Sequence, residues 1–289
     1  MLSRGALSYS SEDAVLATMH GKERVIAPLL ERAMGLRVHV ARDLDTDRFG
    51  TFSRVIARTG SQLDAARAKI EAAFEGDPRA RVGIASEGSF GPHPQIPLLS
   101  FGHEIVVLID RETGLGLIGH HADAATNYGH AIVSDLAGAT AFAGRVGFPD
   151  HGLIVIGCDE QRQPVPSLGL IKDVASPADL ARAVERIVSS SGAAFVETDM
   201  RAHRNPTRMR AIKRATLDLV RRSRSLCPEC NRPGFAVTEC VPGLRCASCA
   251  NPTRIVKAEV MTCAGCRFRF ERQTGTITAE PGFCDYCNP

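Results

Sequence analysis

The chain lacks the sequence features of membrane-spanning and secreted proteins. No apolar run approaches the roughly 20 residues that a membrane-spanning helix needs, and the first residues lack the apolar core and cleavage site of a secretory signal. The 289 residues contain no tryptophan, and residues 1–200 contain a single cysteine, Cys158. Scarce cysteine suits a reducing compartment, where disulfides are rare. We therefore expect a cytoplasmic protein that does not associate with membranes.

The last quarter of the chain is rich in cysteine instead. Eight cysteines form four Cys-x-x-Cys pairs there, namely Cys227/Cys230, Cys246/Cys249, Cys263/Cys266 and Cys284/Cys287. One such turn presents two sulfurs to a tetrahedral ion about 2.3 Å away, and two turns complete a closed site. The pattern predicts two zinc ions, each held by four thiolates in a structural role.

Two arrangements are possible for which cysteine pairs bind the same zinc ion. Fifteen residues separate the first pair from the second, and seventeen separate the third from the fourth. Each length suits a small β-hairpin, so the simplest pairing is sequential and gives two zinc ribbons in tandem. The spacing also allows a cross-braced pairing of the first pair with the third and of the second with the fourth. Cys240 is left over, and we expect it to be a buried or half-buried residue, or a substitute for a neighbouring ligand.

Charge is distributed unevenly along the chain. Residues 1–200 carry a formal net charge of −6, whereas residues 201–289 carry +9. The basic end suits contacts with phosphates or nucleic acid, or it is a solvated basic surface. Aromatic side chains on which bases stack are few in this region. They are Phe235, Phe268, Phe270, Phe283 and Tyr286. Formation of a homodimer is a further role open to this tail.

Hydrophobic patterns predict an α/β domain in residues 1–222, followed by two zinc ribbons in residues 223–289. The apolar share of 44% supports a sizeable core. Apolar runs predict strands at 14–19, 36–41, 80–86, 104–110, 115–121, 152–158 and 193–199. Helical periodicity predicts helices at 25–34, 61–74, 177–188 and 206–222. This alternation, with one antiparallel hairpin, indicates a mixed sheet flanked by helices.

His20-Gly21-Lys22 joins the first predicted strand to the first predicted helix. Glycine lets the backbone approach a ligand, free N–H groups at a helix start attract anions, and lysine adds a positive charge. The segment is therefore a candidate phosphate site, with an ordinary turn as the alternative. The longer glycine-rich sequence of a P-loop is absent.

The predicted functional centre is a loop that we expect directly after the strand at 80–86. Ligands of α/β sheets bind where strands end. Two glycines and two prolines in residues 86–94 favour an unusual backbone there. The candidate binding residues of this loop are Ser86, Glu87, Gly88, Ser89 and His93.

Two further patterns are of a kind that binds ligands in other proteins. Asp43, Asp45 and Asp47 offer oxygen ligands for Mg²⁺, or they are solvated loop acids. The sequence Gly-x-Gly-x-x-Gly at 114–119 matches a dinucleotide-binding pattern. It falls within the predicted hairpin rather than at the start of a helix, so we expect no cofactor there.

Basic residues also surround the start of the last predicted helix, which Asn205 and Pro206 open as an N-cap and a first-turn proline. Their positive charge opposes the helix dipole, and an anionic ligand would relieve that conflict. Arg201, His203 and Arg204 are therefore predicted to bind one phosphate together with Lys22. A plain basic surface is the other interpretation.

These motifs resemble two families. His-Gly-Lys-Glu at 20–23, Ala-Ser-Glu-Gly-Ser-Phe-Gly-Pro-His-Pro at 85–94 and the Cys-Pro-x-Cys-rich tail resemble an uncharacterised bacterial family without an established activity. More distantly, residues 14–222 resemble the inosine/xanthosine triphosphate pyrophosphatase superfamily in the order of their elements. The matching pieces are Gly21-Lys22, Thr51-Phe52, Ala65 to Lys69, Glu87-Gly88 and His203-Arg204.

The second resemblance implies a nucleotide phosphohydrolase that depends on Mg²⁺ or Mn²⁺. Glu87 would then be a metal ligand or base, helped by Asp45 or Asp47, in the attack of water on phosphorus. Many members of that superfamily carry two adjacent aspartates where this chain has Ser86-Glu87. The alternative function is a nucleotide-sensing or nucleic-acid-binding zinc-ribbon protein without catalysis.

Overall fold

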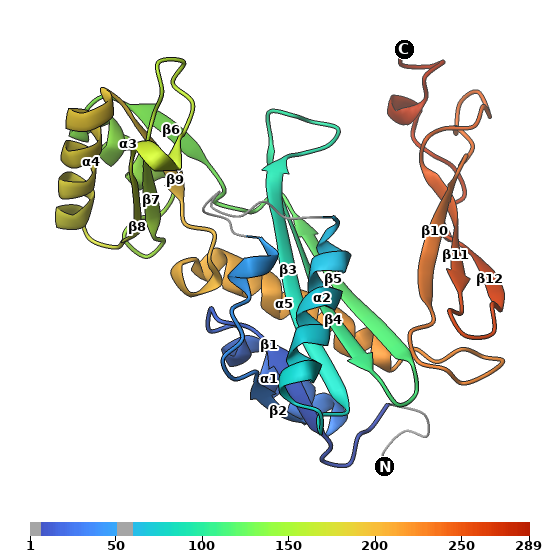
Figure 1. Cartoon of the computed structure of the whole chain (residues 1–289). Helices are drawn as coiled ribbons and strands as arrows, with labels where there is room; N and C mark the ends of the chain where they lie inside the picture. The colour runs from blue at the N-terminus through green and yellow to red at the C-terminus, as the bar shows by residue number, and fades with distance from the viewer. Residues whose placement is uncertain (1–6, 51–59) are drawn as a thin grey trace. The chain divides into compact units, whose positions relative to one another are not determined.

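The computed structural model describes residues 7–50 and 60–289. These residues form two units, Ser8–Val220 and Arg221–Pro289 (Figure 1). The first is an α/β unit with two sheets, and the second is a small unit with one three-stranded sheet. The mixed α/β class predicted from the sequence is confirmed. Thr51 and Phe52, which belong to the superfamily resemblance, lie outside the described residues.

The larger sheet of the first unit has the strand order β2-β1-β3-β4-β5. Its strands are β1 (Asp13–Ala17), β2 (Arg37–Val40), β3 (Val82–Pro92), β4 (Ser100–Asp110) and β5 (Leu115–Asp123). Strand β1 pairs in parallel with β2 and β3, whereas β3, β4 and β5 form an antiparallel meander. This is the mixed sheet that the predicted βα pattern and hairpin indicated.

Strand β3 is longer than its apolar run predicted, and this corrects the functional loop expected at residues 86–94. Residues 82–92 all pair with β4, from Val82↔Asp110 to Pro92↔Ser100. The glycines and prolines of this segment therefore lie in or beside a continuous hairpin, because the backbone hydrogen bonds of a paired strand outweigh the turn preferences of single residues. Glu87, which pairs with Ile105, is in the middle of a strand.

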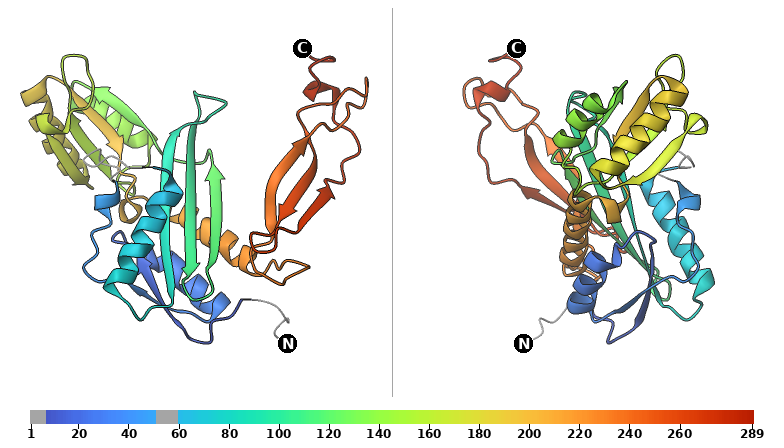
Figure 2. Two further views of the ribbon diagram at one scale, coloured as in Figure 1. Left: turned by 45° about the vertical axis from the view of Figure 1, so that its right-hand side comes forward. Right: turned by 90° about the vertical axis from the view of Figure 1, so that its left-hand side faces the viewer.

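Helices cover both faces of the larger sheet. Figure 2 shows α2 (Gln62–Gly76) on one face, and α1 (Glu23–Met34) with α5 (Pro206–Ser223) on the other. The side chains of Ile70 and Ala73 on α2 pack against Val15 and Val107 of the strands. Helix α5 approaches β5 so closely that a Cβ atom on Gly119 would lie 2.2 Å from the carbonyl oxygen of Ala215. The glycine pattern at 114–119 therefore serves helix packing at this residue.

The second sheet is antiparallel, with the order β6-β9-β7-β8. Its strands are β6 (His130–Val133), β7 (Leu153–Gly157), β8 (Leu170–Val174) and β9 (Ala194–Thr198). Helices α3 (Leu136–Arg145) and α4 (Pro177–Ser191) pack on it through a shared apolar core. The sequence patterns missed β6, α3 and β8, because the two strands are short and α3 is rich in alanine and glycine.

The Arg221–Pro289 unit is a meander of β10 (Ala236–Pro242), β11 (Val256–Thr262) and β12 (Arg269–Gln273). Short 3₁₀ helices complete the described chain at Asp47–Phe49, Pro166–Leu168, Ala202–Arg204 and Pro281–Phe283. None of the helices in the described ranges has the combination of length and apolar content required to cross a bilayer.

Candidate functional sites

The eight paired cysteines gather into two groups of four. Cys227 and Cys230 lie with Cys263 and Cys266, and Cys246 and Cys249 lie with Cys284 and Cys287. The pairing is therefore cross-braced, and the sequential pairing expected as the simplest is wrong. In each group, one cysteine of every pair is buried and the other is exposed.

Strand direction explains the cross-braced arrangement. Strand β10 carries the chain from the first pair to the second, and β11 brings it back to the third. A seven-residue strand spans about 20 Å. The first and third pairs thus meet at one end of the sheet, and the second and fourth meet at the other. The fifteen residues between the first two pairs do not fold back as a separate hairpin.

The sulfur positions fit tetrahedral zinc. Sγ–Sγ distances are 3.6 Å for Cys227–Cys266 and for Cys230–Cys263, and the ligand atoms of each group lie within 4.8 Å of one another. A tetrahedron with metal–sulfur bonds of 2.3 Å has edges of about 3.8 Å. The backbone N–H of Gly265 also points at Cys263 Sγ over 3.3 Å, which stabilises a thiolate. Both groups can hold zinc.

Cys240 belongs to neither group. It lies on β10 opposite Glu259 and is exposed. The expectation of a buried or half-buried side chain is wrong, and the alternative role as a substitute ligand is also not supported by the four-cysteine groups. Alternation along an antiparallel strand places this side chain on a face that lacks a covering layer.

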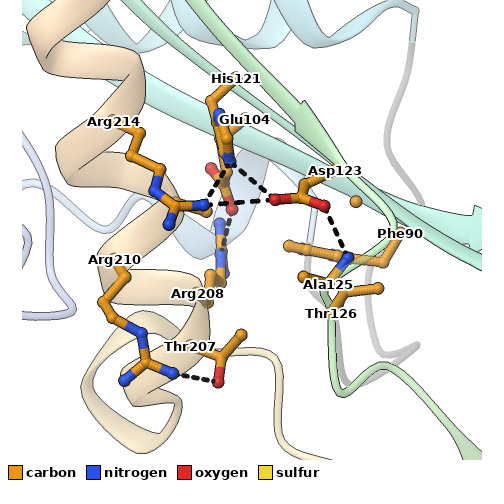
Figure 3. A pocket seen from close by; sticks show the side chains of 12 residues that line it. Phe90, Glu104, His121, Asp123, Ala125, Thr126, Thr207, Arg208, Arg210 and Arg214 are labelled. Atoms are coloured by element: carbon orange, nitrogen blue, oxygen red, sulfur yellow. Dashed lines mark hydrogen bonds and ion pairs between the residues drawn. The ribbon is translucent and has the colours of Figure 1, made fainter.

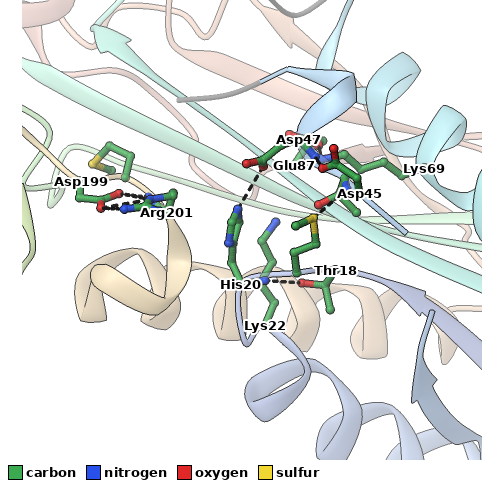
Figure 4. Close-up of polar contacts among 12 residues, drawn as sticks. Thr18, His20, Lys22, Asp45, Asp47, Lys69, Glu87, Asp199 and Arg201 are labelled. Atoms are coloured by element: carbon green, nitrogen blue, oxygen red, sulfur yellow. Dashed lines mark hydrogen bonds and ion pairs between the residues drawn. The ribbon is translucent and has the colours of Figure 1, made fainter. Parts of the chain in front are cut away.

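In the α/β unit, Lys22 and Glu87 lie in a buried cluster of charged side chains (Figure 4). Lys22 is 6% exposed, and its Nζ donates a hydrogen bond to the carbonyl oxygen of Ser86 over 3.0 Å. Glu87 forms a buried ion pair with Lys69. Burial, and after it the positive charge of Arg208, lower the pKa of Lys22 to about 7. The carboxylate of Glu87 is thus already engaged by a lysine.

Arg201 and Arg204 are held by acidic side chains. The Arg201 guanidinium donates to both oxygens of Asp199 over 2.6–3.1 Å and to Asp173 over 3.0 Å. Arg204 Nε donates to Asp173 over 2.9 Å. Figure 4 shows the Asp199–Arg201 pair apart from Lys22. These carboxylates supply the negative charge that was expected from a ligand, and the two arginines do not join Lys22.

His203 lies beside His20 instead. The two imidazole rings stack with centroids 5.0 Å apart, and His20 Nε2 is 3.2 Å from Asp47 Oδ1. A Cβ atom on Gly21, whose φ of +70° suits glycine, would lie 3.9 Å from His203 Cβ. Burial lowers the pKa of His203, and the neighbouring His20 lowers it further. The structure therefore joins the His-Gly turn to the segment before α5.

An open cleft of about 450 Å³ lies between the starts of α1 and α5. Its lining residues are Gly21, Arg24, Val25, Ala202, His203, Pro206, Met209, Arg210 and Lys213. The lining includes three fixed cations and no carboxylate. Within residues 7–50 and 60–289, Arg24, Arg210 and Lys213 form no ion pair. We call this site the α1–α5 cleft.

Of the remaining residues of the predicted loop, His93 and Gly88 have structural roles. Nδ1 of His93 accepts hydrogen bonds from the backbone N–H groups of Gln95 and Ile96, so it stabilises the turn between β3 and β4. Ser89 is exposed on β3. A Cβ atom on Gly88 would lie 2.5 Å from Glu104 Oε1, so close packing requires glycine there.

The acidic residues predicted to help with magnesium do not form a ligand set. Asp45 Oδ1 accepts a hydrogen bond from the backbone N–H of Asp47 over 2.9 Å and so supports its own turn. In the part of the chain that the structure describes, only the two cysteine groups bring three or more metal-ligand atoms together. Magnesium is therefore not indicated by the arrangement of the described side chains.

Several residues of these sites gave no local signal in the sequence. Glu104 comes from the middle of a strand, and only tertiary packing brings it to the buried cluster. Lys69 is part of the superfamily resemblance, but that resemblance does not indicate its pairing with Glu87. Arg210 and Lys213 follow Pro206 on α5. Their spacing of three residues puts them on one side of a helix, and this could have indicated the cleft.

Comparison with known proteins identifies the family. The model of a family described as "Domain of unknown function (DUF6671)" matches residues 69–289, which include the motif at 85–94 and all four cysteine pairs. The match provides no link to the inosine/xanthosine triphosphate pyrophosphatase superfamily. No curated protein matches the chain. Because the matched region covers more than half of its residues, the chain belongs to the DUF6671 family.

Proposed function

We propose that the α/β unit binds a small phosphorylated molecule of the nucleotide class in the α1–α5 cleft. The observation that carries this proposal is the charge of the lining. Arg24, Arg210 and Lys213 bring three positive charges to one concave surface whose lining contains no carboxylate. Such a surface attracts anions, and arginine in particular offers paired donors to phosphate oxygens.

The rest of the lining suits the non-phosphate part of such a ligand. Val25, Ala202, Pro206 and Met209 provide apolar contacts, and His203 provides an aromatic ring. Ligand sites commonly combine an apolar surface with a few polar groups that fix orientation. A nucleotide has this division, with a planar base at one end and phosphates at the other. A cleft of about 450 Å³ is within the usual range for small ligands.

The geometry supports binding better than hydrolysis. Hydrolysis dependent on Mg²⁺ or Mn²⁺ would need a carboxylate to hold the ion or to position water. Glu87, the residue to which the superfamily resemblance gave that role, is paired with Lys69 and is only 4% exposed. Asp47 contacts the imidazole of His20 and does not line the cleft. We therefore propose binding rather than turnover.

The ion pairs of the Arg221–Pro289 unit, which we call the zinc unit, argue against the alternative of nucleic-acid binding. Arg269 pairs with Glu239, Arg272 with Glu259, and Arg254 with Asp285. These pairs reduce the positive charge that the unit can offer to phosphates.

The test is a binding titration with purified full-length, zinc-loaded protein. ATP, ITP, GMP and inorganic phosphate are titrated by calorimetry against the wild type, Arg24→Ala and Lys213→Ala. Each substitution removes a charge-assisted contact, so we expect nucleotide affinity to fall about tenfold. Arg186→Ala is the control, because this exposed arginine on α4 lies outside the cleft.

Two results would contradict the proposal. One is the absence of nucleotide binding by the wild type, and the other is binding that both cleft variants retain at full strength. Release of phosphate and pyrophosphate, measured in the same samples with Mg²⁺ or Mn²⁺, separates binding from hydrolysis.

A further inference from the structure

A second cavity lies in the α/β unit, on the β3-β4-β5 meander near the first turns of α5 (Figure 3). Its volume is about 240 Å³. Arg210 and Arg214 project from α5 on one side, and Phe90 and Asp123 lie on the other. Arg210 also borders the α1–α5 cleft, but the other residues used below line this cavity alone. We call it the meander cavity.

Glu104 is an unusual residue in the wall of this cavity. It is 1% exposed, and its Oε1 accepts a hydrogen bond from Arg208 Nε over 2.6 Å. The other oxygen, Oε2, is buried and has no hydrogen-bond partner among the residues that the structure describes. A buried carboxylate oxygen without a donor is costly, and such atoms need an explanation. A ligand that donates a hydrogen bond would provide one.

The net charge of the cavity lining indicates which chemical group the other end of the ligand carries. The cavity is lined by Arg208, Arg210 and Arg214 and by the carboxylates of Glu104 and Asp123, which gives a formal charge of +1 with His121 neutral. Arg214 is paired with Asp123 over 3.2 Å. The Arg210 guanidinium donates to Thr207 and keeps further N–H donors. A ligand with a single carboxylate group suits this lining, whereas a doubly charged phosphate would face two carboxylates.

The volume limits the size of the ligand. Since a water molecule occupies about 30 Å³ in the liquid, 240 Å³ corresponds to about eight waters. This leaves room for a molecule of roughly the same number of non-hydrogen atoms. Metabolites of that size that combine a single negative charge with a nearby hydrogen-bond donor are small substituted carboxylic acids.

We propose that the meander cavity binds a small carboxylic acid that carries an amino or hydroxyl group on its α-carbon. The carboxylate pairs with Arg210, and the α-substituent donates its hydrogen bond to Glu104 Oε2. The Phe90 ring, which stacks under the Arg208 guanidinium at 5.3 Å, provides an apolar wall for the rest of the molecule.

The test compares acids that differ only in the α-substituent. Alanine, lactate and propionate, and the leucine-sized set of amino, hydroxy and unsubstituted acids, are titrated into the full-length, zinc-loaded protein by calorimetry. We expect the amino or the hydroxy acid of a set to bind about tenfold more tightly than the unsubstituted acid, because only these donate to Glu104. Tighter binding of the amino acid or of the hydroxy acid shows whether the hydrogen-bond donor is an ammonium or a hydroxyl group.

Two variants test the assigned residues. Glu104→Gln should remove most of the preference for the α-substituted acid. Because this change leaves Arg208 without its buried counter-charge, thermal unfolding is measured in parallel. Ala211→Leu fills the cavity from α5 without changing any charge, and it should abolish binding of every acid. Lys213→Ala, in the α1–α5 cleft, is the matched control and should leave acid binding unchanged.

The proposal is overturned if no acid binds at concentrations up to about 10 mM. It is also overturned if the unsubstituted acids bind equally well, or if Ala211→Leu retains full affinity. None of these results depends on nucleotide binding, because the nucleotide variants Arg24→Ala and Lys213→Ala lie outside this cavity.

Discussion

The two units of this protein differ in what stabilises them. The α/β unit buries long apolar side chains on its sheets, with Leu16, Ile84 and Leu108 fully covered. In the zinc unit, every residue of β12 is exposed, and the buried apolar side chains are few and mostly small, with Phe235, Leu244 and Val260 the largest besides the cysteines. A small apolar centre cannot offset the conformational entropy of ordering about 70 residues. We therefore expect metal held by the two cysteine groups to supply most of the stability of that unit.

This difference also determines how visible each site is in the sequence. A zinc knuckle is local, because two cysteines three residues apart already have the geometry of half a site. The cleft and the cavity of the α/β unit are assembled from strands and helices far apart in the chain. Four predictions test this difference between the two units.

Removal of zinc should unfold one unit and spare the other. Because zinc binding and folding of such modules are one equilibrium, worth about 10–16 kcal/mol for zinc-finger peptides, we expect a chelator to abolish amide protection in β10, β11 and β12. The strands of the α/β unit should keep theirs. Hydrogen exchange followed by mass spectrometry, with zinc added back as the control, measures both. Persistent protection of β10–β12 in zinc-free protein would show that the apolar cluster suffices.

Paired cysteine substitutions should reveal the cross-braced sites through zinc stoichiometry. Replacing the first and third pairs with alanine removes one complete site, so one zinc per chain should remain. Replacing the first and second pairs damages both sites, so neither ion should remain tightly bound. Elemental analysis of purified protein distinguishes the two variants. Sequential sites would give the opposite result, with one ion retained after loss of the first and second pairs.

Sequence patterns predicted the regular elements better than the sites. Strands such as β7 and helices such as α4 have uniform apolar runs or a strong helical period, and both were predicted. The eight cysteines predicted to bind zinc do gather in two groups of four, but which pairs share a group depends on the direction of β10 and β11. Glu104 could not be selected, because it belongs to no motif and only the register of β3 with β4 brings it near Glu87. Lys69 ends the helix segment quoted for the superfamily resemblance, but only the packing of α2 shows that it pairs with Glu87.

Gly119→Ala should destabilise the α/β unit strongly. A Cβ atom there would lie 2.2 Å from Ala215 O and 2.5 Å from Leu219 N, which are backbone atoms that cannot rotate away. Helix α5 must therefore move off β5, and overpacking of this kind costs about 3 kcal/mol. Gly116→Ala on the same strand is the matched control, because no atom lies within 4 Å of its added carbon. Thermal unfolding of the two variants measures the difference, and equal melting temperatures would contradict the close packing.

Lys22→Met should weaken the pH dependence of the stability of the α/β unit, an effect smaller than the loss of stability expected for Gly119→Ala. Burial lowers the pKa of Lys22 from 10.5 to about 7 in the folded state. Between these two values the unfolded chain binds the proton and the folded chain does not, so stability rises with pH across this window. The penalty for burying the charge is complete below pH 7 and disappears above about 10.5. From pH 7 to 9 the free energy of unfolding should rise by about 2 to 3 kcal/mol.

Methionine does not titrate, so denaturant unfolding at pH 6.5, 7.5 and 9 should show this rise in the wild type and a smaller rise in the variant. The zinc unit is the same in both proteins, so its own pH dependence cancels in the difference. If both proteins show the same rise, the buried amine is not the group that titrates, and the assignment of Lys22 to a desolvated cluster is wrong.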